Sequence, residues 1–209
     1  MFIPLYDDNS TRRSQPFVVY LLILTCSLVW LLQLNSSPDF TLSLAASPLR
    51  VIGHGEIATL FTAMFLHGSW LHLIGNMIYL FIFGDQVEDE LGHLRFLFFY
   101  LTCGILAGLA YVYSEIGSET PSLGASGAIA GVLGAYLVIK PSNNVQVFVV
   151  RTVVSMPASL VLGFWFLMQF SGQFGRAESD GIAYMAHLGG FVVGVLLILL
   201  MRRRQIPKA

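Results

Sequence analysis

The sequence has few charged residues, since 12 acidic and 11 basic side chains make up only 11% of its 209 residues. Soluble domains average about 25%. Hydrophobic residues reach 56%, and the long apolar runs exclude nearly all of the charges. This scarcity excludes an ordinary soluble domain and predicts a polytopic membrane protein. The formal net charge of −1 gives no indication of nucleic-acid binding.

Cysteine is also scarce. The two cysteines, Cys26 and Cys103, both lie inside apolar runs. They do not form the spaced pattern of a disulfide framework, and they say little about the redox compartment. The sequence also shows no low-complexity tract, no convincing internal repeat and no separate soluble domain.

Apolar segments define the predicted architecture. A bilayer core takes about 20 apolar residues as a helix. On this basis six segments are expected to span the membrane: residues 17–34, 64–83, 94–113, 124–139, 148–170 and 182–201. The stretch 36–62 is interrupted by prolines and glycines, so we expect a loop at the membrane interface. The prediction is an all-α membrane protein, a bundle of six transmembrane helices over residues 17–201, flanked by segments 1–16 and 202–209.

Basic residues predict the orientation of this bundle. Nine of them fall on one side and two, Arg50 and Arg176, on the other. The nine are Arg12, Arg13, Arg95, Lys140, Arg151, Arg202, Arg203, Arg204 and Lys208. Because cytoplasmic loops are enriched in Lys and Arg, both termini should be cytoplasmic and the 36–62 loop external.

Strongly polar side chains within a span are costly and are candidates for function. We select five candidates: His67, His72, Asn76, Ser126 and His187. The height of each residue above the cytoplasmic end of its span follows from the helical rise of about 1.5 Å per residue. It is about 21 Å for Ser126, about 22 Å for His187 and about 20 Å for His72. Three helices therefore bring these side chains to one layer, about 10 Å below the outer edge of the core.

Glycine spacing indicates that two of these helices pack closely. Gly127, Gly131 and Gly134 share one face of the fourth segment, and Gly190 and Gly194 share a face with His187 in the sixth. Small residues let helix backbones approach each other in membranes. Such packing would bring Ser126 within hydrogen-bond reach of His187.

The chemistry that this arrangement favours is nucleophilic catalysis. The imidazole could take the hydroxyl proton during attack and return it to the leaving amine. No Asp or Glu lies at this depth, so a full triad is not available and the pair would act as a dyad. The Ser126 amide at a helix N-terminus, with His72 and Asn76 on one helix face, would stabilise the oxyanion.

Other interpretations remain. Glycine faces alone more often serve packing, and a membrane serine often bonds back to its own helix. A zinc site of His67, His72 and His187 is disfavoured, because residues five apart lie roughly 140° around a helix and no Cys or carboxylate joins them. A channel would need a continuous polar path, which three of the segments do not supply.

Four motifs in this order are similar to those of the rhomboid intramembrane serine proteases. Gly124-Ala-Ser126-Gly127 resembles the nucleophile motif, and Ala186-His187-Leu-Gly-Gly190 with Gly194 resembles the general-base helix. The segment from His67 to Asn76 resembles the second-span motif. Gly84, Glu88 and Gly92 resemble the G-x-x-x-E-x-x-x-G turn.

The resemblance implies a rhomboid-like six-helix fold and a role for each residue. Ser126 would be the nucleophile and His187 the base, with His72, Asn76 and the Ser126 amide around the oxyanion. His67, Glu88, Gly124, Gly127, Gly190 and Gly194 would be structural. Two positions depart from the pattern: residues 55–59 lack the Trp-Arg pair of many relatives, and Ala130 replaces an aromatic that packs on the base.

The resulting prediction is an intramembrane serine endopeptidase that uses no cofactor and no metal. Its partners would be single-span transmembrane substrates and the surrounding lipid, with no nucleic acid. It would be a multi-pass protein of a prokaryotic plasma membrane. The alternative is a catalytically silent rhomboid-like protein that binds membrane clients.

Overall fold

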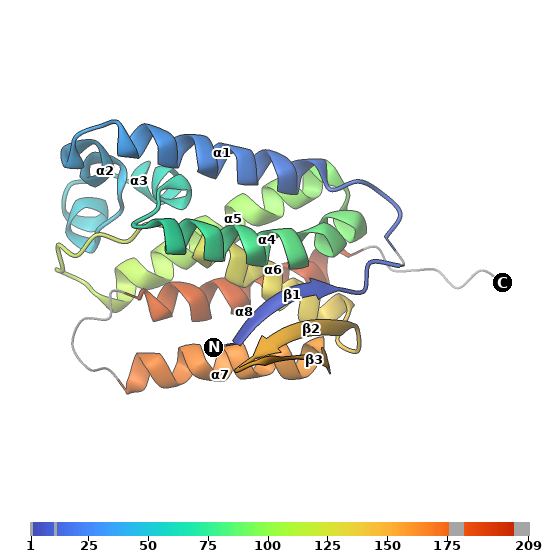
Figure 1. Cartoon of the computed structure of the whole chain (residues 1–209). Helices are drawn as coiled ribbons and strands as arrows, with labels where there is room; N and C mark the ends of the chain where they lie inside the picture. The colour runs from blue at the N-terminus through green and yellow to red at the C-terminus, as the bar shows by residue number, and fades with distance from the viewer. Residues whose placement is uncertain (1, 11, 176–181, 203–209) are drawn as a thin grey trace.

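The protein is a bundle of helices with a small sheet along one side (Figure 1). The structure, a computed structural model, describes residues 2–10, 12–175 and 182–202. Arg176, Arg203, Arg204 and Lys208, which were used to predict orientation, lie outside the described residues. The six longest helices are α1 (Phe17–Leu34), α4 (Trp70–Leu91), α5 (His93–Ser114), α6 (Ser126–Ile139), α7 (Ala158–Phe174) and α8 (Tyr184–Met201).

Helix α6 is the core of the bundle. Its residues from Gly127 to Tyr136 are all buried, so it is covered on every side, chiefly by α4, α5 and α8. A helix that is apolar all round is expected at such a central position. The first residue of this central helix is Ser126, which is partly buried.

Three of the described helices, α1, α5 and α8, are both long and apolar enough to cross a bilayer. A fourth crossing results if the short turns before α4 and α4 itself, which meet at a 92° bend, are counted together. Helix α6 is apolar but shorter, and α7 has 17 residues. The bounds of α1 coincide with the predicted first segment, whereas the count of six spans stays a prediction.

Residues 36–62 form short helices where a loop was expected. They contain α2 (Pro38–Leu44), the π-helical turn η1 (Leu49–Gly53) and α3 (Thr59–Thr62), and the 3₁₀ turn η2 (Ala63–Phe65) follows. The Arg50 guanidinium donates to the carbonyls of Leu42, Ser43 and Ala45 and pairs with Glu56. These contacts join residues of the same segment and stabilise its fold in the absence of a Trp-Arg pair.

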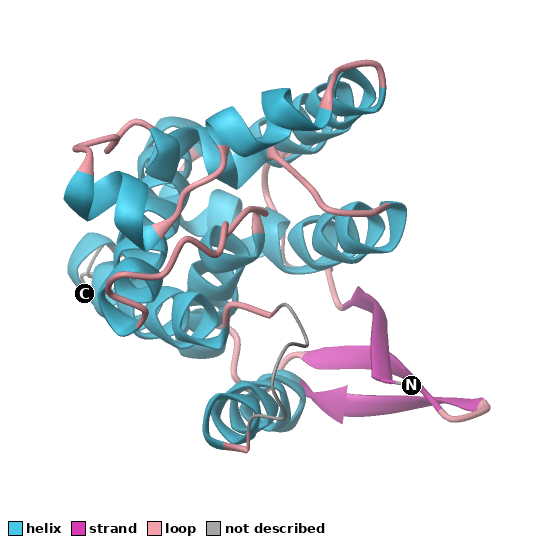
Figure 2. Cartoon of the chain, turned by 90° about the vertical axis from the view of Figure 1, so that its left-hand side faces the viewer, coloured by secondary structure: helices cyan, strands magenta, loops and turns pink. Residues whose placement is uncertain are grey.

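A three-stranded antiparallel sheet corrects both the all-α prediction and the predicted fifth span. Strands β1 (Phe2–Asp7), β2 (Asn144–Val149) and β3 (Thr152–Pro157) pair in the order β1-β2-β3, next to α7 (Figure 2). The prediction of a span from residue 148 was therefore wrong up to Pro157, and α7 begins at Ala158. Hydropathy alone does not separate such a strand from a buried helix, and the valine-rich composition favours strands.

The second span was also displaced. Helix α4 begins at Trp70, where the Ser69 hydroxyl caps it by accepting from the His72 amide at 3.1 Å, and it continues to Leu91. The predicted span 64–83 thus began six residues before the start of α4 and ended eight residues before its end. Glu88 consequently lies within the last turns of α4.

Glu88 and two glycines join α4 to its neighbours. The buried Glu88 carboxylate accepts the backbone amides of Val18 and Val19 at 2.9 and 2.8 Å. These are among the first amides of α1, which have no partner within their own helix. Gly84 packs against Val19, and Gly92 turns the chain into α5 with φ +79°.

Candidate active site

Ser126 and His187 form the centre of the site. The Ser126 hydroxyl lies 2.8 Å from Nε2 of His187, across 61 positions of sequence. Ser126 is the first residue of α6, and His187 lies in the first turn of α8. Gly124 precedes the serine with φ +128°, a conformation open to glycine but costly for other residues. The serine thus follows a tight glycine turn, with its backbone amide at a free helix N-terminus.

Glycine packing between α6 and α8 sets this distance. A Cβ atom at Gly190 would lie 2.1 Å from the Gly127 carbonyl oxygen, and one at Gly194 would lie 2.0 Å from that of Gly131. Separations this short leave no room for any side chain at either position. The two backbones therefore touch, as small residues allow in membrane helices.

The second ring nitrogen of His187 contacts a residue that the sequence analysis did not single out. Nδ1 lies 2.7 Å from Oε1 of Gln169 in α7, and the Gln169 side chain is buried. Trp165, one helical turn earlier, packs against the same imidazole with ring centroids 6.0 Å apart. The sequence signal for Gln169 is a glutamine four positions after a tryptophan in an apolar segment. It indicates a contact with His187 only if that face of α7 is known to turn toward α8.

His72 and Asn76 approach the serine turn from α4. His72 Nε2 and Asn76 Nδ2 lie 2.7 and 3.7 Å from the position that a Cβ on Gly124 would take. The Gly68 amide donates to His72 Nδ1 at 3.4 Å, which leaves the proton on Nε2, facing the turn. Asn76 Nδ2 is buried and has no hydrogen-bond partner among the described residues. The turn before Ser126 therefore faces two N–H donors.

His67 packs beside His72 with ring centroids 5.2 Å apart at 70°. The sequence argument against a zinc site placed both histidines on one helix, which was wrong because His67 precedes the start of α4. The His67 backbone amide donates to Gln33 Oε1 of α1 at 3.0 Å, and Gln33 Nε2 donates to the His67 carbonyl at 3.1 Å. Among the described residues, no three His, Cys, Asp or Glu side chains gather as metal ligands would.

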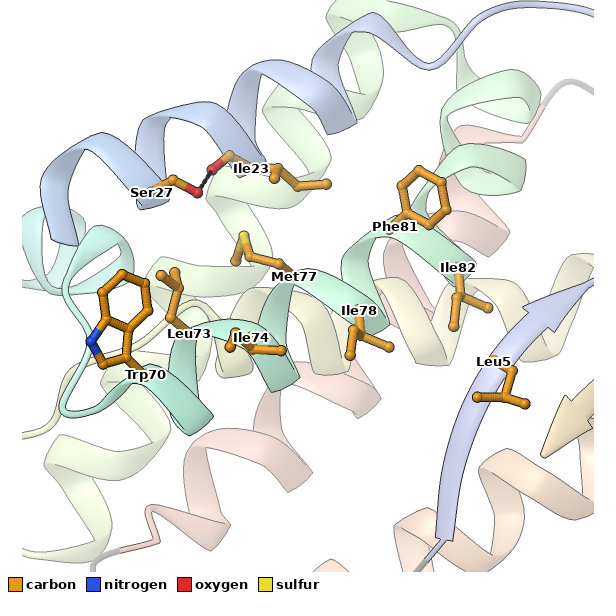
Figure 3. A pocket seen from close by; sticks show the side chains of 10 residues that line it. All are labelled: Leu5, Ile23, Ser27, Trp70, Leu73, Ile74, Met77, Ile78, Phe81 and Ile82. Carbon is orange, nitrogen blue, oxygen red and sulfur yellow. Dashed lines mark hydrogen bonds between the residues drawn. The ribbon is translucent and has the colours of Figure 1, made fainter. Parts of the chain in front are cut away.

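An apolar groove of about 440 Å³ lies elsewhere, between α1 and α4 (Figure 3). Its lining includes Ile23 and Ser27 of α1, Trp70 and Phe81 of α4, and Leu5 of β1. The α4 residues that line it lie on the opposite helix face from His72 and Asn76. The groove is therefore not the cavity of the serine–histidine site.

The fold and these contacts define a helical membrane protein with a serine–histidine pair between tightly packed helices. The chain belongs to the rhomboid family, because the Rhomboid domain model matches residues 54–204. The resemblance that the four motifs predicted is thereby confirmed.

Three curated relatives illustrate the range of the family. RHOMBOID-like protein 5 of Arabidopsis thaliana is 32% identical over 162 residues, which are 76% of this chain and 49% of the relative. Rhomboid protease GluP of Bacillus subtilis is 33% identical over 189 residues, 88% of this chain and 34% of the relative. Putative rhomboid protease YdcA of the same bacterium is 30% identical over 202 residues, 94% of each chain. The chain thus spans half or less of the length of the first two.

Proposed function

We propose that this protein is an intramembrane serine endopeptidase that cleaves transmembrane segments of other membrane proteins. The observation that carries the proposal is the 2.8 Å contact between the Ser126 hydroxyl and His187 Nε2. The names of two bacterial relatives, a rhomboid protease and a putative rhomboid protease, support the same activity.

The reaction begins with attack of Ser126 Oγ on the scissile carbonyl carbon. His187 Nε2 accepts the hydroxyl proton and donates it to the departing amine, which leaves an acyl-enzyme. Water then attacks the ester, gives a proton to His187 and releases the carboxylic acid, and the proton returns to Ser126. His187 carries the proton in both steps.

Three N–H donors stabilise the oxyanion in both steps. They are the Ser126 backbone amide, His72 Nε2–H and Asn76 Nδ2–H. The unpartnered state of Asn76 Nδ2 supports this role, because a buried donor without a partner is costly unless it serves a ligand. Such preorganised donors act where negative charge develops.

The same proposal includes the setting of the site. Residues 17–201 form a six-span catalytic domain between a cytoplasmic segment 1–16 and a basic tail 202–209. The protein resides in a prokaryotic plasma membrane with both termini in the cytoplasm. Its substrates are single-span membrane proteins that enter from the lipid.

Cleavage of a reporter tests the proposal. Purified protein and a single-span reporter are incorporated into liposomes, and product is followed by gel and mass spectrometry. Ser126→Ala and His187→Ala should each abolish cleavage. Two matched controls should retain it: Ser27→Ala, whose hydroxyl donates to the Ile23 carbonyl of its own helix, and the exposed His54→Ala.

Two outcomes would refute the proposal. Cleavage by Ser126→Ala at the wild-type rate would show that Ser126 is not the nucleophile. Stable binding of the reporter by the wild type without any cleavage would instead identify a catalytically silent rhomboid-like protein.

A further inference from the structure

Gln169 is a polar side chain in an otherwise apolar stretch of α7. Its neighbours Met168 and Phe170 are about half exposed, whereas Gln169 is only 8% exposed. Within a bundle in lipid, the interior is where a polar side chain finds a partner. The partner here is His187, whose Nδ1 lies 2.7 Å from Gln169 Oε1.

The direction of this hydrogen bond follows from the chemistry of the ring. A neutral imidazole carries one N–H, so one nitrogen donates and the other accepts. If Nε2 is to accept the Ser126 proton, the ring hydrogen must be on Nδ1. Gln169 Oε1 can only accept, so its position favours this tautomer and disfavours the reverse one.

Trp165 restrains the same ring from its face. It lies four residues before Gln169, on the same side of α7, and its ring plane is tilted 38° from that of His187. Trp165 also stacks on Phe191 at 6.2 Å, which fixes the indole against α8. Helix α7 therefore holds the imidazole both at its edge and on its face. The site does not require an aromatic at Ala130.

We propose that Gln169 is the positioning residue of the Ser126–His187 pair, an inference that rests on the proposed function of that pair. It holds His187 in the tautomer with hydrogen on Nδ1 and aims Nε2 at the serine hydroxyl. Because the amide is neutral, it orients the base without the charge that a carboxylate would bring. Helix α7 thus contributes to proton transfer without touching the reacting atoms.

The test compares Gln169→Met, an apolar side chain of similar length, with Gln169→Glu, which keeps the acceptor. In Gln169→Met, kcat for cleavage of the liposome reporter should fall. The smallest expected loss is about tenfold, the scale of one lost hydrogen bond. The largest is about 10⁴-fold, the scale of a wrong tautomer. KM should stay within about twofold. Gln169→Glu should restore most of the rate and move the acidic limb of the pH–rate profile to higher pH, since a carboxylate favours the imidazolium.

A second measurement does not depend on activity. Nitrogen-15 NMR of histidine-labelled protein distinguishes the two tautomers, and the His187 signals are identified by their loss in His187→Ala. The wild type should show hydrogen on Nδ1, Gln169→Met should show both tautomers, and the lipid-facing control Met168→Leu should match the wild type.

The outcomes separate this inference from the proposed function. An active wild type together with unchanged kcat, pH profile and tautomer in Gln169→Met would overturn the positioning role alone. An inactive wild type with the predicted tautomer shift would keep the positioning of His187 and overturn the proposed protease. If the wild type has hydrogen on Nε2, the inference is wrong whatever the activity.

Discussion

Ser126 differs from three other hydroxyl residues, Thr25, Ser27 and Ser36, in where its side chain points. The hydroxyls of Thr25, Ser27 and Ser36 each donate to a carbonyl four residues earlier in the same segment. This back-bonding is the usual state of Ser and Thr in helices. Ser126 at the start of α6 instead contacts His187 of another helix. Its hydroxyl is therefore directed toward a base and not toward its own backbone.

Asn76 supplies a prediction at the same scale. Replacing it with Ala removes the unpartnered Nδ2 donor, and losing one oxyanion donor costs about 10²–10³ in kcat. KM and thermal stability should change little, because no hydrogen bond of that donor within the described residues is lost. Steady-state kinetics with the reporter measures both constants. The control is Asn35→Ala, an exposed residue at the end of α1, which should behave as wild type. A mainly raised KM in Asn76→Ala would assign the residue to substrate binding.

The candidate residues were accessible from sequence to different degrees. Ser126, His187, His72 and Asn76 were found because polar groups are conspicuous in apolar runs and helical rise converts their positions into depth. Gln169 was not, because Gln173 follows it one turn later on the same helix face, so only the position of α7 along its axis decides which of them lies level with the base. The displaced start of the fifth span hid that position.

At the scale of elements, the contact between α6 and α8 determines the geometry of the site. A methyl group at Gly194 would lie 2.0 Å from the Gly131 carbonyl oxygen, within backbone that has no side chain to move aside. Gly194→Ala should therefore separate the helices and lengthen the Ser126–His187 contact. We expect a loss of stability of about 1–3 kcal/mol, the usual scale of overpacking, together with loss of cleavage.

The matched control for this prediction is Gly163→Ala in α7. A methyl group there would have nothing within 4 Å, and alanine favours a helix over glycine. Its melting temperature in detergent should equal or exceed that of the wild type. Equal melting temperatures and activities for Gly194→Ala and the wild type would contradict the close packing of α6 on α8.

The elements that sequence predicted poorly depend on distant partners. Strand β1 pairs with β2 across about 140 positions, Phe2 lying opposite Val149, and no local pattern encodes such a pairing. Glu88 was expected to be structural in the turn after α4. Its carboxylate contacts His93 at the start of α5 at 2.5 Å, and it also binds an amide of α1, 70 positions earlier, which no local pattern indicated. The helices themselves were predictable because apolar length is a local property. Their bounds shifted where a cap such as Ser69 or a strand such as β3 intervened.

For the whole molecule, the two ends of the bundle differ in the contacts that connect their segments. At one end Arg12 pairs with Asp85 at 2.9 Å, and Arg13 pairs with Asp89 at 3.3 Å. At the other end, the residues 36–62 join the turn before α6 through the pairing of Ala46 with Ser122. Which of these ends faces the cytoplasm stays a prediction, in which the end that carries Arg12 and Arg13 is inside.

Reporter fusions test this orientation. Reporters attached at the N-terminus and after Ala209 should be active only in the cytoplasm, and one inserted at Ala45 should be active only outside. The charge asymmetry is the reason, since positively charged loops remain inside during insertion. An external signal from either terminus would contradict both the orientation and the depth argument for the site.

The central claim is that His187 activates Ser126 as a nucleophile within the bundle. A fluorophosphonate probe applied to native membranes tests it directly, because only an activated serine forms the phosphonyl ester. The account predicts labelling of the wild type at Ser126 by mass spectrometry and of Ser27→Ala to the same extent. Labelling should be lost in Ser126→Ala and nearly lost in His187→Ala. A folded wild type that takes no label, or equal labelling of Ser126→Ala, would contradict the account.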